Sequence, residues 1–263
     1  MARYWMLLLA AFAASAAADQ RPVLSLVIDD LGYSLDHGLA AIELEGDHTY
    51  AILPESIYSL RLAQRAHQLD KEVILHLPMQ SISSGAPQEP NVLNESMDEN
   101  QLTDEVHSLL DAVPYIRGVN NHMGSHLTEF DFFMRPIMDS IRGYDPHLYF
   151  LDSRTSTLSV AYAQALDAGL PSVRRDVFLD NETNTESIYL QYRIWLEIAR
   201  KHGSAIAIGH PHTETIEVLR NNLANTSTEF RFLRVSKLID LRKAKKSSRK
   251  QQEKGAQLHA VAD

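Results

Sequence analysis

Two adjacent aspartates, Asp29 and Asp30, follow an apolar segment and lead into a glycine at position 32. The apolar run at residues 23–28 predicts a buried parallel strand, and two carboxylates at its end repel each other unless a cation or a shared proton relieves them. In metal-dependent hydrolysis one such carboxylate binds the metal and the other accepts a proton from the attacking water. The alternative is a turn in which Asp30 or Ser34 caps the next helix.

The rest of the sequence alternates short apolar runs with amphipathic stretches, a pattern typical of βα units around a parallel sheet. We therefore expect an α/β fold, a distorted (β/α) barrel of about seven parallel strands. The predicted strands span residues 24–28, 49–53, 72–77, 118–120, 148–151, 172–178 and 205–209. The predicted helices span residues 56–69, 98–113, 131–142, 160–168, 185–201 and 214–225.

Polar residues capable of chemistry follow six of these strands. The carboxyl ends of parallel strands meet at one end of a barrel, which is where barrel enzymes have their active sites. We therefore expect these residues to share a single site. Besides the aspartate pair they are His76; Asn121, His122 and His126; Asp152 and Arg154; Arg175 and Asp180; and His210 and His212.

Asp30 with two or three histidines is a suitable ligand set for a divalent metal ion. We expect Zn²⁺, because it binds imidazole nitrogen and carboxylate oxygen and leaves one position for water. Asp29 is then the general base. His210 is placed to donate a proton to a leaving group, and His212 would support it. Two alternatives stay open: His76 as a buried core residue, and residues 210–212 as a rigid turn.

Other polar residues at the strand ends have supporting roles in this hypothesis. Asn120 and Asn121 orient a ligand or bind a sugar hydroxyl, unless they only form an Asn-rich turn. Two groups are expected to form salt bridges that hold the site, with substrate contact as the secondary interpretation: Asp152 with Arg154, and Arg175 with Asp176 and Asp180.

The remaining histidines lie outside the strand ends, and we expect them at the surface. Other catalytic schemes fit the sequence less well, since it has no cysteine nucleophile, no Gly-x-Ser-x-Gly elbow and no glycine-rich phosphate loop. The seven histidines expected at the surface are His37, His48, His67, His107, His147, His202 and His259.

Residues 1–18 have a basic start, a short apolar core and an Ala-x-Ala ending, which predicts a secretory signal peptide. The apolar stretch falls short of the roughly 20 residues that a membrane-spanning helix needs. We therefore expect an exported, periplasmic protein with no transmembrane segment in the mature chain. Because the sequence has no cysteine, the single domain expected at residues 19–241 must be stabilised by its hydrophobic core.

Charge is unevenly distributed along the chain. Residues 242–254 carry seven basic residues and one acidic residue, a net charge of +6, and once Arg3 and Asp263 are counted the total of −9 leaves −15 for residues 19–241. An acidic domain argues against nucleic acid as a partner. We expect the basic tail at residues 242–263 to be disordered, with contact to an anionic lipid or cell-wall polymer as the alternative.

Six segments, taken together and in order, resemble the divergent polysaccharide deacetylase family, the YibQ-like proteins, in the NodB-like carbohydrate esterase superfamily. The resemblance runs from about residue 23 to residue 239. The segments are Ile28-Asp-Asp-Leu-Gly32, Leu75-His-Leu-Pro-Met79, Gly118-Val-Asn-Asn-His-Met-Gly-Ser125, Phe150-Leu-Asp-Ser-Arg-Thr155, Val177-Phe-Leu-Asp-Asn181 and Ile208-Gly-His-Pro-His212.

The resemblance implies a NodB-like distorted barrel and a metal-dependent esterase that removes N- or O-acetyl groups from glycans. It assigns the base to Asp29, a metal ligand to Asp30 and the acid to His210. In the family pattern a His-x3-His pair on the third strand binds the metal. Here His76 is followed at the second position of that pair by Gln80, which is a poor metal ligand.

Two ligand sets are therefore open: Asp30, His76 and His122, or Asp30, His122 and His126. We favour the first, because its members come from separate strand ends around one axis. The leading hypothesis is an exported metal-dependent deacetylase acting on an acetylated polysaccharide or cell-envelope glycan. The Gln80 departure supports a second hypothesis, a non-catalytic envelope protein that binds glycan or a partner on the same barrel. A different metal hydrolase is the third.

Overall fold

The computed structural model describes residues 19–82 and 91–260 of the chain. The predicted signal peptide at residues 1–18 lies outside these ranges and stays a prediction. Within the two ranges, no helix combines the length and the apolar character needed to cross a membrane.

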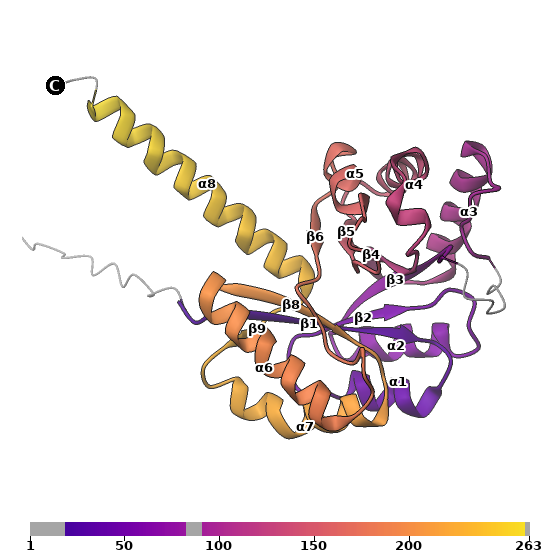
Figure 1. Cartoon of the computed structure of the whole chain (residues 1–263), viewed down its shortest axis with the longest axis horizontal. Coiled ribbons are helices and arrows are strands. Elements are labelled where there is room, and N and C mark those ends of the chain that lie inside the picture. The colour runs from indigo at the N-terminus through magenta and orange to yellow at the C-terminus, as the bar shows by residue number, and fades with distance from the viewer. Residues whose placement is uncertain (1–18, 83–90, 261–263) are drawn as a thin grey trace, which may run out of the picture.

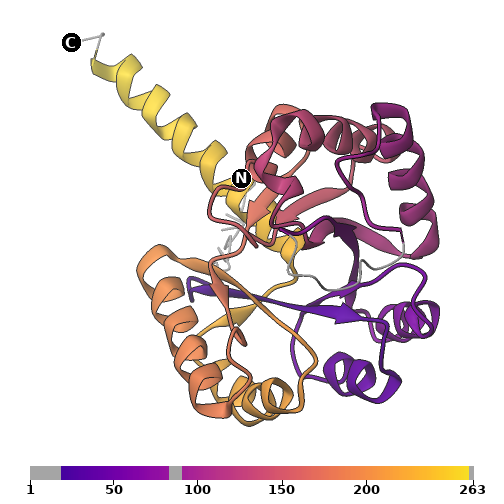
Figure 2. The same cartoon turned by 45° about the vertical axis from the view of Figure 1, so that its right-hand side comes forward.

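The strands form one sheet in which every neighbouring pair is parallel. The order along the sheet is β6-β5-β4-β3-β2-β1-β8-β7, and β9 also pairs with β1. The strands curl around a common axis with the helices arranged around them (Figure 2), which confirms the expected barrel-like fold. The strands are β1 (Val23–Leu31), β2 (Thr49–Ile52), β3 (Glu72–Met79), β4 (Ile116–Met123), β5 (Tyr149–Asp152), β6 (Ser172–Arg174), β7 (Val177–Phe178), β8 (Ser204–Gly209) and β9 (Arg231–Phe232).

Residues 172–178 do not form the single strand that we predicted. They form two short strands on opposite edges of the sheet, β6 beside β5 and β7 beside β8. The change of partner occurs between them: the Arg175 amide donates to the Asp152 carbonyl at 3.0 Å and the Asp176 amide to the Ile206 carbonyl at 2.9 Å. One segment thus joins both edges. The prediction was wrong because an apolar pattern indicates that a segment is extended but does not indicate which strand it pairs with.

Six predicted helices are confirmed as α2 to α7, and the structure adds α1 and α8. Reciprocal hydrogen bonds between Asp98 and Gln101 cap α3, and α6 begins at the Asn184 cap and ends at Gly203, whose φ is 80°. The helices are α1 (Leu35–Ile42), α2 (Ser59–Gln68), α3 (Glu99–Ala112), η1 (Leu127–Glu129), α4 (Asp131–Tyr144), α5 (Ala161–Asp167), α6 (Thr185–His202), α7 (Thr213–Thr226) and α8 (Val235–Ala260).

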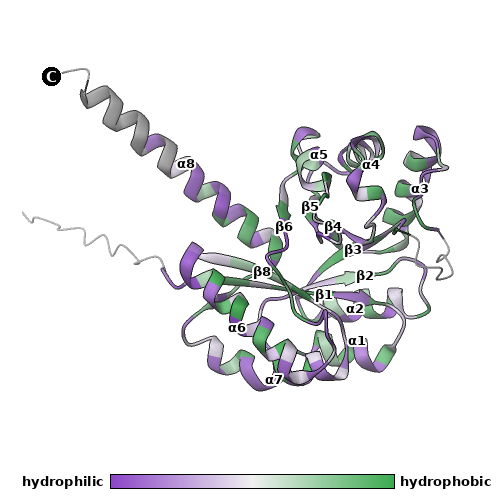
Figure 3. Cartoon of the chain, in the orientation of Figure 1, coloured by the Kyte–Doolittle hydropathy of each residue, from purple (hydrophilic) through white to green (hydrophobic). Residues whose placement is uncertain are grey.

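Alternate residues of β1 face two different layers of the core. Leu24 and Ile28 pack in the layer between the sheet and the helices, whereas Val23 and Val27 belong to the layer inside the curled sheet. Hydrophobic residues accordingly dominate the strands, while the surrounding helices carry both polar and apolar residues (Figure 3). Asp29 lies on the same face of β1 as Val23 and Val27, so its carboxylate borders the apolar interior of the curled sheet.

Val235, Leu238 and Ile239, from the first turns of α8, fill the interior at the amino-terminal ends of the strands. Beyond them the helix projects away from the domain (Figure 1) and reaches Ala260. We expected a disordered tail from residue 242, and the structure describes a helix there. Lysine, arginine, glutamine and alanine, which dominate this segment, all have high helix propensities.

A buried carboxylate, Glu72, holds the start of α8. Its Oε1 accepts hydrogen bonds from the Ser236 backbone amide at 3.2 Å and from the Thr49 and Tyr149 hydroxyls at 2.9 Å each. A negative charge at a helix N-terminus is stabilised by the free amides and the helix dipole. The helix is therefore tied to the first residues of β2, β3 and β5.

His48, which we expected at the surface, is fully buried. Its Nε2 lies 2.6 Å from the Glu45 carbonyl oxygen, and its ring packs edge-on against Phe232 with the centroids 5.3 Å apart. The residue directly precedes β2, a central strand, and the burial of that strand extends to it. Burial lowers the pKa of His48 to about 4.

This shift predicts a loss of stability on acidification. Between the ordinary histidine pKa of about 6.5 and the folded value, the unfolded chain binds a proton at His48 that the folded chain does not, so the free energy of unfolding falls as the pH falls. Between pH 7 and pH 5 we expect the free energy of unfolding of His48→Gln to fall by about 2 kcal/mol less than that of wild type, as measured by urea unfolding. His37→Gln, in the exposed part of α1, should lose as much as wild type. Equal losses for His48→Gln and wild type would contradict the assignment.

Candidate active site

Asp29 and Asp30 reach the site through an irregularity in β1. Successive residues of a regular strand point to opposite faces, yet the pairing with β2 shifts register between Ile28 and Leu31, and Asp30 has a φ of 58°. Left-handed backbone at a non-glycine residue is strained and clusters at functional sites. Both carboxylates consequently face His76, whose Nε2 lies 3.7 Å from Asp29 Oδ2 and 3.0 Å from Asp30 Oδ1.

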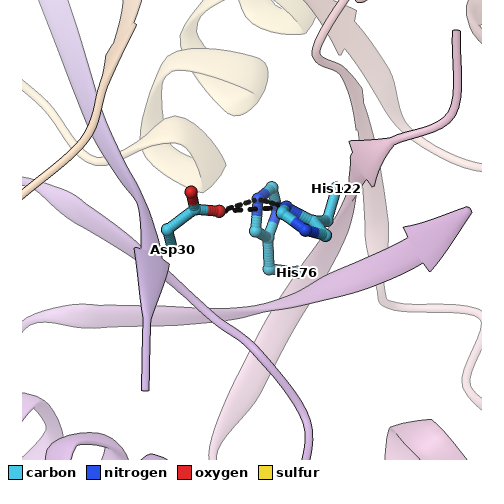
Figure 4. Close-up of side chains that lie close together, drawn as sticks. All are labelled: Asp30, His76 and His122. Carbon is cyan, nitrogen blue, oxygen red and sulfur yellow. Dashed lines mark hydrogen bonds and ion pairs between the residues drawn. The ribbon is translucent and has the colours of Figure 1, made fainter. Parts of the chain in front are cut away.

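Asp30, His76 and His122 point toward one another from β1, β3 and β4 (Figure 4). His76 Nε2 and His122 Nδ1 each lie 3.0 Å from Asp30 Oδ1 and 3.1 Å from each other. These atoms make one of two clusters of metal-ligand type among the described residues. Ligand atoms about 2.1 Å from a tetrahedral ion lie roughly 3.4 Å apart, so a small expansion of this triangle would fit a metal ion.

Asn120 determines which nitrogen of His76 carries a proton. The Asn120 amide nitrogen donates to Asp29 Oδ1 at 2.9 Å and to the Ser153 hydroxyl at 3.2 Å, so its oxygen faces His76 Nδ1 at 2.8 Å. His76 therefore donates from Nδ1, and its neutral form presents the Nε2 lone pair to Asp30. A metal-binding histidine is commonly held by an acceptor on its other nitrogen, so this arrangement fits a divalent cation.

The surroundings of the two aspartates give them different acidities. Burial raises the pKa of Asp29, which is 2% exposed, although His76 and His210 oppose the shift. Burial acts in the same direction on Asp30, but hydrogen bonds with His122 and His76 hold its pKa well below the usual range. Asp30 is the firmly ionised carboxylate and Asp29 the one that more readily takes up a proton, which suits a ligand and a base.

His210 approaches the same carboxylates from the end of β8. Its Nε2 lies 3.8 Å from Asp30 Oδ2, and its Nδ1 donates to Asp180 Oδ1 at 2.9 Å. The His210 backbone amide and the Thr215 hydroxyl donate to Asp180 Oδ2 at 2.6 and 2.7 Å. Burial lowers the pKa of His210, but Asp180 and Asp30 outweigh it and raise the pKa to about 9. A protonated imidazole held by a carboxylate suits a general acid.

His126 lies apart from this cluster. Its Nε2 is 2.8 Å from Glu95 Oε2. The chain leaves β4 at Met123 and Gly124, where φ is 53° and 84°, so the helical turn that would bring His126 beside His122 does not form. The geometry favours the first of the two ligand sets.

Two further residues of interest, His212 and Gln80, are not part of the metal-type cluster. His212 is exposed before the first turn of α7, with its ring centroid 5.8 Å from that of His210, and these two residues with Asp180 make the second cluster. Gln80 holds a loop, since its side-chain oxygen accepts the Glu95 backbone amide at 2.8 Å. The position that carries a histidine in the family pattern is thus used here for loop structure.

The salt bridges that we expected at the strand ends are not formed among the described residues, so this prediction was wrong. Asp152 instead accepts the Arg154 backbone amide at 2.8 Å and the Ser159 hydroxyl at 3.0 Å. Arg175 donates to the Ser153 and Arg154 carbonyls at 2.6 and 2.9 Å. Both side chains are therefore engaged by groups of the loop after β5, and these hydrogen bonds hold the loop in place beside the site.

Asp176 and Asn121 are likewise engaged with backbone. Asp176 accepts the Ile206 amide at 2.8 Å. Asn121 donates to the Met123 carbonyl at 2.8 Å and accepts the Ser153 amide at 2.8 Å, which joins the ends of β4 and β5. Neither side chain belongs to the ligand clusters.

Sequence reasoning did not anticipate Ser153, Thr215 or Phe178 as parts of the site. The Phe178 ring lies 4.8 Å from the Arg175 guanidinium carbon and 5.2 Å from the His210 ring. The Thr215 hydroxyl reaches Asp180, which follows β7, from the first turn of α7, so its role depends on a neighbour from another element. The roles of the other two depend on neighbours from different strands.

Comparisons with known proteins identify the family of this chain. A sequence profile of divergent polysaccharide deacetylases matches residues 26–239. The chain is 36% identical over 217 residues to the uncharacterized protein YibQ of Escherichia coli (strain K12), covering 82% of this chain and 67% of YibQ. It is 35% identical over 215 residues to an uncharacterized protein of Haemophilus influenzae (strain ATCC 51907 / DSM 11121 / KW20 / Rd), covering 82% and 76%.

The fold also has a counterpart among solved structures. Protein ATU2773 from Agrobacterium tumefaciens C58 superposes with a TM-score of 0.79 at 23% sequence identity, covering 84% of this chain and 91% of that one. The profile match spans the whole curled sheet, from β1 to the first turns of α8. The chain belongs to the divergent polysaccharide deacetylase family.

Proposed function

We propose that this protein is an exported, zinc-dependent deacetylase that removes acetyl groups from a polysaccharide or another glycan of the cell envelope. The observation that carries the proposal is the convergence of Asp30, His76 and His122 beside the buried Asp29 and beside His210. Family membership supports a glycan substrate. The signal-like pattern of residues 1–18 supports export.

Zinc is the metal we propose because two imidazoles and one carboxylate form a typical catalytic zinc set that leaves one position open. When bound by Asp30, His76 and His122, zinc would polarise the acetyl carbonyl and lower the pKa of a water molecule. Asn120 keeps the His76 ring in the orientation that binding requires.

The chain's own residues move the protons. Asp29 takes a proton from the attacking water as oxygen bonds to the acetyl carbon. His210 then gives a proton from Nε2 to the leaving nitrogen or oxygen as its bond to that carbon breaks, which yields acetate and a free amine or hydroxyl. Asp180, which is itself held by the Thr215 hydroxyl, keeps the imidazole oriented throughout.

Removing a ligand should weaken zinc binding. We expect His76→Ala and His122→Ala to lower zinc affinity about a hundredfold or more, and Asn120→Ala to lower it about tenfold to a hundredfold, because Asn120 orients a ligand. Competition with a chromogenic chelator measures the affinity. His126→Ala is the matched control and should stay near wild type. If His126→Ala lowered the affinity as much as His76→Ala, the ligand set would be the other one.

Removing the base or the acid should abolish turnover and leave the metal bound. We expect Asp29→Asn and His210→Ala to reduce acetate release by about a hundredfold to ten-thousandfold. Zinc affinity should change little, because neither side chain is in the ligand triangle. Acetate is measured with N-acetylated chitin oligosaccharides and with O-acetylated xylan, which separates amide from ester cleavage.

The outcomes of the turnover experiment distinguish the catalytic function from a non-catalytic binding role. Equal acetate release from wild type, Asp29→Asn and His210→Ala would contradict the mechanism. Stoichiometric zinc uptake without acetate release from either class of glycan would favour the non-catalytic binding role.

A further inference from the structure

The mouth of the barrel is edged by exposed apolar side chains. The most exposed large apolar residues in the described part of the chain are Ile57 at 81%, Phe132 at 78%, Leu158 at 67% and Ile82 at 61%. Each lies in a loop or first helical turn that follows the carboxyl end of a strand, after β2, β4, β5 and β3. Exposed apolar residues gathered in one region mark interaction surfaces.

Hydrogen bonds between successive loops join these residues into one arc, which we call the apolar arc and define by Ile57, Ile82, Phe132 and Leu158. The arc borders the site, because the same strands carry His76 and His122. The links are Asn91 to Glu55 between the loops after β3 and β2, Ile82 to Ser125 at 3.0 Å between those after β3 and β4, and Val160 to Thr128 at 2.8 Å between those after β5 and β4.

The opposite part of the mouth is polar. Residues 181–184, after β7, are Asn-Glu-Thr-Asn and all exposed, and His212 after β8 is exposed as well. A substrate that covers the whole mouth therefore meets the apolar arc on one side and exposed polar side chains on the other. A hydrocarbon chain would cover the apolar arc, whereas a free polysaccharide offers it only the C–H faces of its rings.

Arg154 lies in the loop after β5, between a residue that bonds to the site and a residue of the apolar arc. Arg154 follows Ser153, whose hydroxyl bonds Asn120 of the site, and precedes Leu158 in the same loop. The Arg154 side chain is exposed, and none of the described residues accepts a hydrogen bond or forms an ion pair with its guanidinium. Arginine in such a place suits a phosphate group.

We propose that the substrate is a lipid-linked glycan, an acetylated sugar joined through phosphate to a hydrocarbon chain. The hydrocarbon lies on the apolar arc, the phosphate pairs with Arg154, and the sugar faces the polar half. The inference rests on the proposed deacetylase function and adds its substrate class. The positive charge of Arg154 selects a phosphate-linked lipid over a neutral one.

Three probes separate the contributions of lipid and phosphate: a dodecyl phosphodiester of N-acetylglucosamine, N-acetylglucosamine 1-phosphate without the chain, and the phosphate-free dodecyl glycoside. Binding is measured by calorimetry on the mature Asp29→Asn protein with zinc, below the micelle concentration, so that no turnover is needed. We expect the phosphodiester to bind at least about tenfold more tightly than either other probe.

Surface variants locate the contacts. Ile57→Ser and Leu158→Ser should each weaken the two dodecyl probes about tenfold and leave the sugar phosphate unchanged. Arg154→Gln should weaken the two phosphate probes and leave the dodecyl glycoside unchanged. Leu166→Ser, which alters a residue 47% exposed near the far end of α5, is the matched control and should change none of the three affinities.

Several results would overturn the proposal: no binding of any probe, equal affinities with and without the chain, or equal effects of Leu166→Ser and Ile57→Ser. If Ile57→Ser and Leu158→Ser changed the oligomeric state and left all three affinities intact, the apolar arc would be a protein interface instead. Chain-dependent binding without acetate release would contradict only the deacetylase function. Acetate release from soluble glycans with no gain from the chain would contradict only the lipid inference.

Discussion

Backbone hydrogen bonds from Arg175 and Asp176 tie the two edges of the curled sheet together. Because of this tie, β7 lies beside β8, and Asp180 at the end of β7 meets His210 at the end of β8. β8 is also the neighbour of β1, which brings His210 to 3.8 Å from Asp30. An open sheet with the same strands would spread these groups along an edge, whereas the curled sheet gathers them around one axis.

Charge balance is the second requirement of this arrangement. Asp29, Asp30 and Asp180 are three carboxylates near a largely apolar interior, and burial of isolated charges there is costly. His76, His122 and His210 surround them as potential cations, and Asn120 and Thr215 supply neutral donors. No single side chain could be buried here alone, so the site is stable only as a group, and a divalent ion in the Asp30 triangle would extend the same balance.

Much of the fold and part of the site could be predicted from the sequence because the relevant signals are local. Apolar runs predict strands, and parallel strands place their carboxyl ends together whatever their order, which was enough to associate Asp30, His76, His122 and His210. The predictions that failed depend on which residues are neighbours in space. The split of residues 172–178 and the burial of His48 follow from which strands lie alongside.

The same limit applies within the site. The backbone turn at Met123 and Gly124 diverts His126. The partners of Asp152 and Arg175 are groups of a loop whose path depends on the assembled sheet. The expectation of a disordered end of the chain failed for another reason. Charge there suggested disorder, although the residues that carry it are also good helix formers.

The placement of β1 also constrains the order in which the chain can fold. This earliest strand pairs with β8 and β9, and the first turns of α8 fill the interior beneath it. Contacts between such distant parts of the sequence slow folding, and during synthesis they cannot form until the last elements have been made. A growing polypeptide with this topology therefore stays without a complete core through most of translation.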